Sequence, residues 1–105
     1  MKPYTDAALT ITIQGADLST GSDIHFTMVQ GGRDIDTDDV TATSDGQGGC
    51  TLSVSLTQVQ TARLRDDIAA EAQVNWLDGN GKRKATEKVV IPVGSQLLKR
   101  VIYGD

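Results

Sequence analysis

The sequence predicts an all-β fold, an antiparallel β-sandwich of about seven strands. Apolar and polar residues alternate in several short segments, which places every second side chain on one face of a strand. Clusters of glycine and aspartate separate these segments at the spacing typical of sandwiches. The 105 residues suffice for one hydrophobic core, so we expect a single domain over residues 1–94 and a C-terminal strand or arm over residues 95–105.

The clearest element is a hairpin in the second half of the chain. Alternation over residues 70–76 puts Ala70, Ala72, Val74 and Trp76 on one face. The Asp-Gly-Asn-Gly stretch at 78–81 supplies residues that tolerate a positive φ, and residues 85–93 form the return strand. Pro92 belongs at an edge or a strand end, because it cannot donate a ladder hydrogen bond.

Three further segments alternate clearly and one does so weakly. The clear strands cover residues 9–14, 24–30 and 50–56, and the weak one covers residues 34–43. Their expected inward side chains are Leu9, Ile11, Ile13, Ile24, Phe26, Met28, Leu52, Val54 and Leu56, with Ile35, Val40 and Ala42 in the weak segment.

Two segments depart from the strand pattern. Residues 57–64 fit one or two helical turns with Thr57 as the N-cap. The C-terminal stretch is apolar enough to need a surface to rest on, and it is either a last strand or an arm that docks on a neighbour. Its candidate interaction residues are Leu97, Leu98, Val101, Ile102 and Tyr103.

Composition and charge disfavour several classes of protein. A net charge of −4 argues against a nucleic-acid partner. No apolar run is long enough to span a bilayer, and residues 1–6 lack the apolar stretch of a signal peptide. The single cysteine, Cys50, has no second cysteine for an internal disulfide. Residues 1–67 carry ten acidic and four basic side chains, whereas residues 68–105 carry four and six, an asymmetry that can orient neighbouring subunits.

The best candidate metal ligands are Asp34, Asp36 and Asp38. In an extended segment these carboxylates project from one face, and with Asp45 their spacing resembles the start of a calcium loop. The glycine of such a loop is replaced by Asp39, and Asp45 stands where a bidentate glutamate is needed. We therefore favour a solvated strand edge whose charges block aggregation, and we expect no metal or cofactor.

Other chemistry-bearing residues have simpler interpretations. His25 faces outward and has no evident nucleophile or orienting partner, so we expect a surface histidine and no enzymatic activity. The run at 82–84 suits acidic partners or sulfated glycans, or merely solvates the hairpin. Trp76 is either a sugar-stacking platform or a core residue, and its place in the alternation favours the core.

Three stretches, in chain order, resemble short structural proteins encoded in prophages of gut Firmicutes, and also the immunoglobulin-like N-terminal module of phage baseplate upper proteins. They are Asp17-Leu18-Ser19; Val54-Ser55-Leu56-Thr57-Gln58 with Thr61 and Leu64; and Ala72-Gln73-Val74-Asn75-Trp76 with Asp78-Gly79, Ala85-Thr86-Glu87 and Ile91-Pro92-Val93-Gly94. Asn75 stands where relatives commonly have arginine, and Lys88 where they have an apolar residue.

The resemblance implies an immunoglobulin-like sandwich and a virion structural protein, made in the bacterial host cytoplasm and placed in a phage tail or baseplate. It carries over no catalytic residue. The expected partners are phage structural proteins or further copies of the chain. The alternatives are capsid decoration, or binding of a host-surface glycan through residues 34–39 or 79–84.

Overall fold

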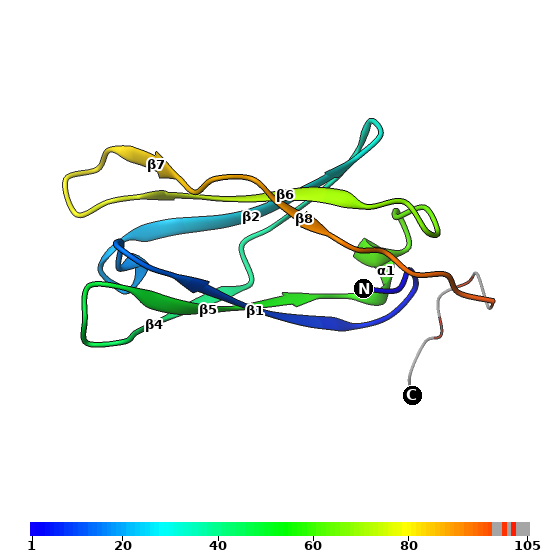
Figure 1. Ribbon diagram of the computed structural model, residues 1–105, viewed down its shortest axis with the longest axis horizontal. Helices are drawn as coiled ribbons and strands as arrows, with labels where there is room; N and C mark the ends of the chain where they lie inside the picture. The colour runs from blue at the N-terminus through cyan, green and yellow to red at the C-terminus, as the bar shows by residue number, and fades with distance from the viewer. Residues whose placement is uncertain (98–99, 101, 103–105) are drawn as a thin grey trace.

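Two antiparallel sheets pack face to face in the computed structural model, which describes residues 1–97, 100 and 102 (Figure 1). One sheet has the order β1-β5-β4. The other has the order β3-β2-β6-β7, and β8 also pairs with β6. The strands are β1 (Ala7–Ile13), β2 (Ser22–Gln30), β3 (Arg33–Thr37), β4 (Val40–Ser44), β5 (Cys50–Leu56), β6 (Ala70–Leu77), β7 (Arg83–Ala85) and β8 (Val89–Ile91). A 3-10 turn, η1 (Leu18–Thr20), and a short helix, α1 (Gln58–Thr61), complete the described elements.

The strand order is that of an immunoglobulin-like sandwich, so the predicted fold class is confirmed. Such domains place strands B, E and D in one sheet and C′, C, F and G in the other. Here β1, β5 and β4 take the places of B, E and D, while β3, β2 and β6 take those of C′, C and F. The place of G is shared by β7 and β8, so eight short strands fill seven places. Among the described residues, no strand takes the place of A beside β1.

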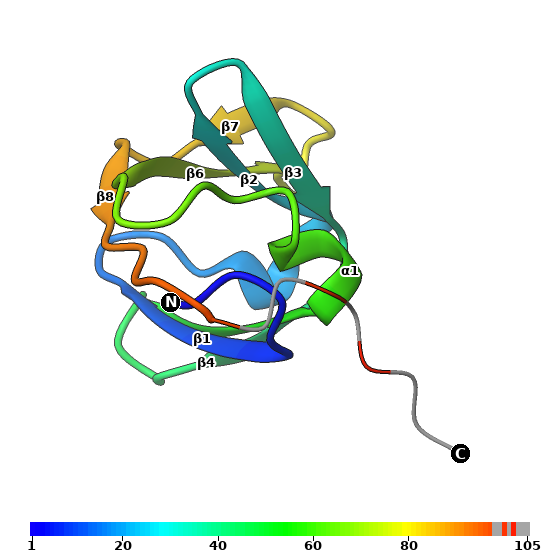
Figure 2. The ribbon, with the colours of Figure 1, turned by 90° about the vertical axis from the view of Figure 1, so that its right-hand side faces the viewer.

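Figure 2 shows the two sheets facing each other. The core lies between them, where the alternating apolar residues meet. Phe26 and Met28 of β2 are fully buried, as are Leu52, Val54 and Leu56 of β5. Trp76 is only 9% exposed and belongs to the same cluster, which confirms the core interpretation. Cys50 is buried as well, and its Sγ accepts the backbone N–H of Leu18 at 3.4 Å.

The segment predicted as one weak strand over residues 34–43 is two strands in different sheets. The inward residues Ile35 and Thr37 of β3 occupy odd positions, whereas Val40 and Ala42 of β4 occupy even ones. The chain changes sheets between them, and Val40 donates its N–H to the carbonyl of Asp38 at 2.8 Å. The change of phase in the alternation is the sequence signal of this crossover.

The return strand predicted over residues 85–93 is also interrupted. Thr86 donates its N–H to the carbonyl of Val74 at 2.9 Å, and its hydroxyl accepts the N–H of Val74 at 3.1 Å. Because the side chain replaces a backbone acceptor, the chain leaves the ladder at residues 86–88 and rejoins β6 as β8. Pro92 follows directly after β8, at the strand end predicted for it.

The predicted helical turn is present and begins at the predicted residue. The Thr57 hydroxyl accepts the N–H of Gln60, and the Gln60 side chain accepts the N–H of Thr57, which makes a capping box. Thr61 is fully buried, where its hydroxyl accepts the N–H of Thr5 at 2.9 Å and donates to the carbonyl of Thr5 at 2.7 Å. The helix therefore anchors the segment that leads into β1.

Candidate functional site

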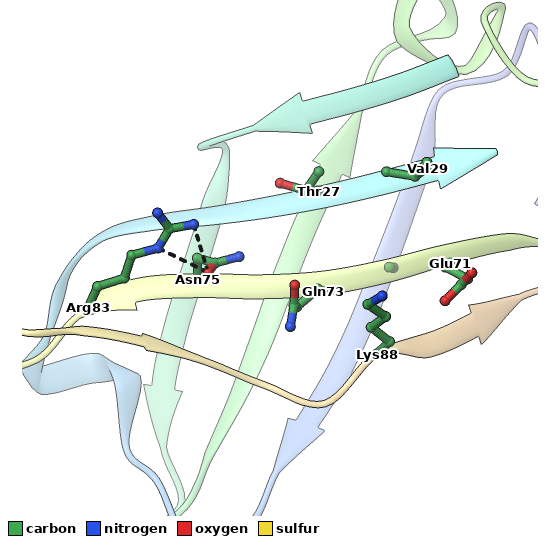
Figure 3. Close-up of a pocket in the computed structure, with 8 residues that line it drawn as sticks. Thr27, Val29, Glu71, Gln73, Asn75, Arg83 and Lys88 are labelled. Carbon is green, nitrogen blue, oxygen red and sulfur yellow. Dashed lines mark hydrogen bonds between the residues drawn. The ribbon is translucent and has the colours of Figure 1, made fainter. Parts of the chain in front are cut away.

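The outer face of the five-stranded sheet carries a hollow of about 350 Å³ with polar walls (Figure 3). Arg83 reaches from β7 over β6, where its Nε and Nη2 donate to Oδ1 of Asn75 at 3.3 and 3.2 Å. Lys88 lies at the other end of the hollow, beside Gln73 and Glu71 (Figure 3). The lining residues are Thr27, Val29, Glu71, Ala72, Gln73, Asn75, Arg83 and Lys88.

A second hollow, of about 420 Å³, adjoins the first and shares Thr27, Asn75 and Arg83 with it. It contains His25, whose Nδ1 lies 3.3 Å from Oδ1 of Asp36 on the neighbouring strand. Both side chains are about half exposed. We call the two hollows together the polar groove. Its carboxylates, amides and cations suit a hydroxyl-rich ligand better than an apolar one.

The candidate metal ligands do not converge. Asp34 and Asp36 lie on β3, but Asp34 lies 3.7 Å from the guanidinium of Arg63 and Asp36 contacts His25. Asp38 follows the strand, in the crossover to β4. Asp45 is engaged in its own turn, where its carboxylate accepts the N–H groups of Gln47 and Gly49. Within residues 1–97, 100 and 102, no three metal-binding side chains gather in one place.

A third hollow, of about 190 Å³, opens between the two sheets rather than on their outer faces. Ile11 and Ile13 of β1 form one wall, and Val89 of β8 forms part of the other. Its remaining lining comes from Thr12, Phe26, Ala72, Gln73, Val74, Thr86 and Glu87. We call this hollow the apolar slot. It lies at the side of the sandwich where β1 and β8 are the edge strands.

The predicted interaction residues of the C-terminal stretch are only partly described. Leu97 is completely exposed, and Ile102 exposes 59% of its surface. The backbone of Ile102 is nevertheless tied to α1, since its N–H donates to Oε1 of Gln58 at 2.8 Å and its carbonyl accepts the Gln58 amide. Leu98, Val101 and Tyr103 lie outside the described residues.

Two carboxylates in turns have a lowered pKa. The backbone N–H groups of Lys82 and Asn80 hydrogen-bond to Asp78 and hold its pKa below the ordinary value. The hydroxyls of Ser19 and Ser44, followed by the N–H of Ser19, do the same for the pKa of Asp17, which caps η1. Both groups stabilise local turns, so their shifts have a structural origin.

No protein-family model matches the sequence, and no curated protein matches it. Among solved structures, murine CRIg is similar over 91% of this chain and 89% of that chain, at 10% sequence identity and a TM-score of 0.36. At this identity and score the likeness carries no functional inference, and the assignment of the fold depends on the strand order. Within the described residues, no helix has the length and apolarity needed to cross a membrane.

Sequence reasoning missed both the polar groove and the apolar slot. The outward side chains of residues 70–77 and 24–30 could have indicated a polar face, because Gln73, Asn75 and Thr27 alternate with the core residues. The slot had no such signal. It exists because of which strands become neighbours, and that depends on pairings between distant parts of the chain.

Proposed function

We propose that this chain is a non-enzymatic structural protein of a bacteriophage or prophage particle, placed in the tail or baseplate and acting through protein–protein assembly. Capsid decoration is the alternative location. The resemblance of the three sequence stretches supports the phage origin, and the sandwich provides a rigid frame for such a role.

The observation that carries the assembly role is the exposure of large apolar side chains near the C-terminus. Leu97 is completely exposed, and Ile102 exposes 59% of its surface. The two residues are five positions apart in the sequence, and exposed apolar side chains that lie together mark sites at which a partner binds. Since α1 holds the backbone of Ile102, the side chain of Ile102 is presented from a fixed position.

The experiment is to induce particles from the bacterium that encodes the chain, purify them on a density gradient and measure copy number by mass spectrometry. We expect the chain at a constant ratio to the major structural proteins. Absence from the purified particles would overturn the proposed function.

The same particles test the role of the C-terminal side chains. We expect the double variant Leu97→Ser and Ile102→Ser to be lost from the particles. Val59 on α1 is about as exposed as Ile102, and we expect the control variant Val59→Ser to remain at its normal copy number. Full incorporation of the double variant would overturn the assignment of these residues as the interface.

A second candidate function, binding of a host-surface glycan, is favoured by the polar groove. The Asn75 and Arg83 side chains already hydrogen-bond to each other there and could be shared with sugar hydroxyls. Trp76 is buried, so it does not supply a stacking platform. We expect Asn75→Ala to reduce binding to a cell-wall polysaccharide on an array; no binding by the wild-type chain would overturn this candidate.

A further inference from the structure

We propose that β1 pairs with β1 of a second copy of this chain, antiparallel and edge to edge, to form a symmetric dimer with one continuous six-stranded sheet. The inference names a partner for the assembly function above and depends on that function only for its biological purpose. Three independent features of the β1 side lead to it.

The first feature is the edge itself. Among the described residues β1 bonds only to β5, so its other side is unpaired. A Cβ built on Gly49 would lie 2.6 Å from the carbonyl oxygen of Ile13, so Ile13 directs its carbonyl towards β5. By alternation Ala8, Thr10 and Thr12 direct their N–H and C=O groups outward. These groups are the template onto which another strand adds.

The second feature is the lack of charge on this edge. Proteins protect edge strands with charged side chains, prolines or bulges. The edge strand β3 carries Arg33, Asp34 and Asp36, and β7 carries Arg83 and Lys84. Two other edges are uncharged: β4 is shorter and packs against η1, and β8 has only three residues and is followed directly by Pro92. β1 has seven residues, none charged and none proline, so it lacks all of these protections.

The third feature is the apolar slot directly beside this edge. Ile11 and Ile13 face the interior but remain partly exposed, and Val89 is half exposed although it also lines the slot. On the neighbouring strand β5 every inward residue is at most 2% exposed. A strand beside β1 would place its own inward side chains against the slot and cover these residues.

The sequence of β1 makes a second copy the fitting occupant. If Thr10 lies on the two-fold axis, it faces Thr10 of the partner, Ile11 faces Leu9, and Thr12 faces Ala8. Both members of every pair then lie on the same face, with large apolar side chains on the inner side and small side chains, threonine and alanine, on the outer side. All outward-directed backbone groups of Ala8, Thr10 and Thr12 find partners, and no like charges meet.

The test measures the solution mass of the full chain and of two lysine variants across a wide concentration range. Thr10, Ser53 and Thr41 form one row across the outer face of the sheet, with Thr10 on the proposed edge and Thr41 on the opposite edge. We expect a wild-type dimer, and a dissociation constant about fivefold higher for Thr10→Lys, because two lysines face each other at the axis. The matched control Thr41→Lys leaves the constant unchanged.

A cross-linking measurement fixes the register. Opposed residues in a hydrogen-bonded antiparallel pair have Cα atoms about 5.5 Å apart, which lies within the range of Cα separations that disulfides span. We expect Thr10→Cys to form a covalent dimer under mild oxidation and Thr41→Cys to stay monomeric on the same non-reducing gel; the native Cys50 is buried.

A wild-type chain that stays monomeric at all concentrations, or equal effects of the two lysine substitutions, would overturn the proposal. Either result leaves the particle measurement untouched, because incorporation through Leu97 and Ile102 does not require β1. Conversely, a β1 dimer in solution from a chain absent from particles would overturn the phage function and keep the dimer.

Discussion

The two long sides of the sandwich are closed in different ways. On the side of β3 and β4, the chain crosses from one sheet to the other at residues 38–39, and η1 packs on β4. Gln30 at the end of β2 binds the loop after α1 through three hydrogen bonds, which join its amide to the carbonyls of Arg65 and Ile68 and to the N–H of Arg65. Chain connections and satisfied polar groups therefore cover this side.

Less of the chain covers the side of β1 and β8. At one end, the N-terminal amine donates to the carbonyl of Pro92 at 3.0 Å and Gly94 donates to the carbonyl of Met1 at 2.7 Å. Beyond these two hydrogen bonds, the apolar slot separates the edges of the two sheets. β5 lies between β1 and β4, so its inward side chains are covered on both flanks, whereas those of β1 have a neighbouring strand on one flank and the apolar slot on the other.

The largest expected effect comes from breaking the core on the covered strand. Leu52 of β5 and Ile11 of β1 are register neighbours, but Leu52 is fully buried and Ile11 is not. We expect Leu52→Ala to lower the free energy of unfolding by about 3 kcal/mol, through lost transfer energy and a cavity. For Ile11→Ala we expect about 1 kcal/mol, because less surface is removed from water.

Urea denaturation of the two variants at low protein concentration checks this difference, since dilution separates folding from association. Equal losses for Leu52→Ala and Ile11→Ala would contradict the view that the β1 side is open. A loss of unfolding free energy for Ile11→Ala that grows with protein concentration would support this view, because the partner strand would then bury Ile11 in the dimer.

A smaller effect is expected from the buried glutamine on the closed side. Gln30→Leu leaves the N–H of Arg65 and the carbonyls of Arg65 and Ile68 without their partner, which should cost about 2 kcal/mol of unfolding free energy. The matched control lies on the open side. Gln73 is partly buried and makes one bond, to the carbonyl of Thr86, so Gln73→Leu should cost about 0.5 kcal/mol.

Thermal unfolding followed by circular dichroism ranks these two variants. A larger loss for Gln73→Leu than for Gln30→Leu would mean that the residues 86–88 beside the slot contribute more to stability than the loop after α1. That order would contradict the assignment of the closed side.

The alternation in the sequence predicted much of this architecture, because a strand with one buried face has an apolar residue at every second position. Residues 50–56 and 70–76 are examples, and the hydroxyl at Thr57 likewise marked the start of α1. A hydrogen bond between a strand side chain and the backbone of its neighbour leaves no such pattern in the sequence. The bond of Thr86 to the backbone of Val74 splits the return strand, yet a threonine is an ordinary strand residue.

The candidate sites were harder to predict than the strands. Asp34 and Asp36 look like a metal cluster in the sequence, but each has a partner on another element: Arg63, after α1, for Asp34, and His25, on the neighbouring strand β2, for Asp36. The apolar slot exists because none of the described strands lies beside β1 on its outer side, and such an absence leaves no pattern in a sequence. Only the pairing of all strands shows which edge remains open.

The smallest expected effect compares one carboxylate on each side at low pH. Asp78 belongs to the hairpin that leads to β7, whereas Asp17 caps η1 on the closed side. Since both have a pKa lowered by folding, each stabilises the protein fully above its unfolded pKa of about 3.9, and that stability is lost as the pH falls through the folded pKa. Asp78→Asn and Asp17→Asn should therefore lower the melting temperature slightly at pH 7, and this difference from wild type should disappear once the pH lies below the folded pKa of the carboxylate. Melting curves across this range measure the difference.

The two substitutions differ in what they loosen. The hydroxyl of Ser44 on β4 also bonds Asp17, so Asp17→Asn loosens a contact between η1 and the sheet, whereas Asp78→Asn loosens only a turn. A pH-independent difference from wild type in either variant would show that the charge of that carboxylate does not stabilise its turn.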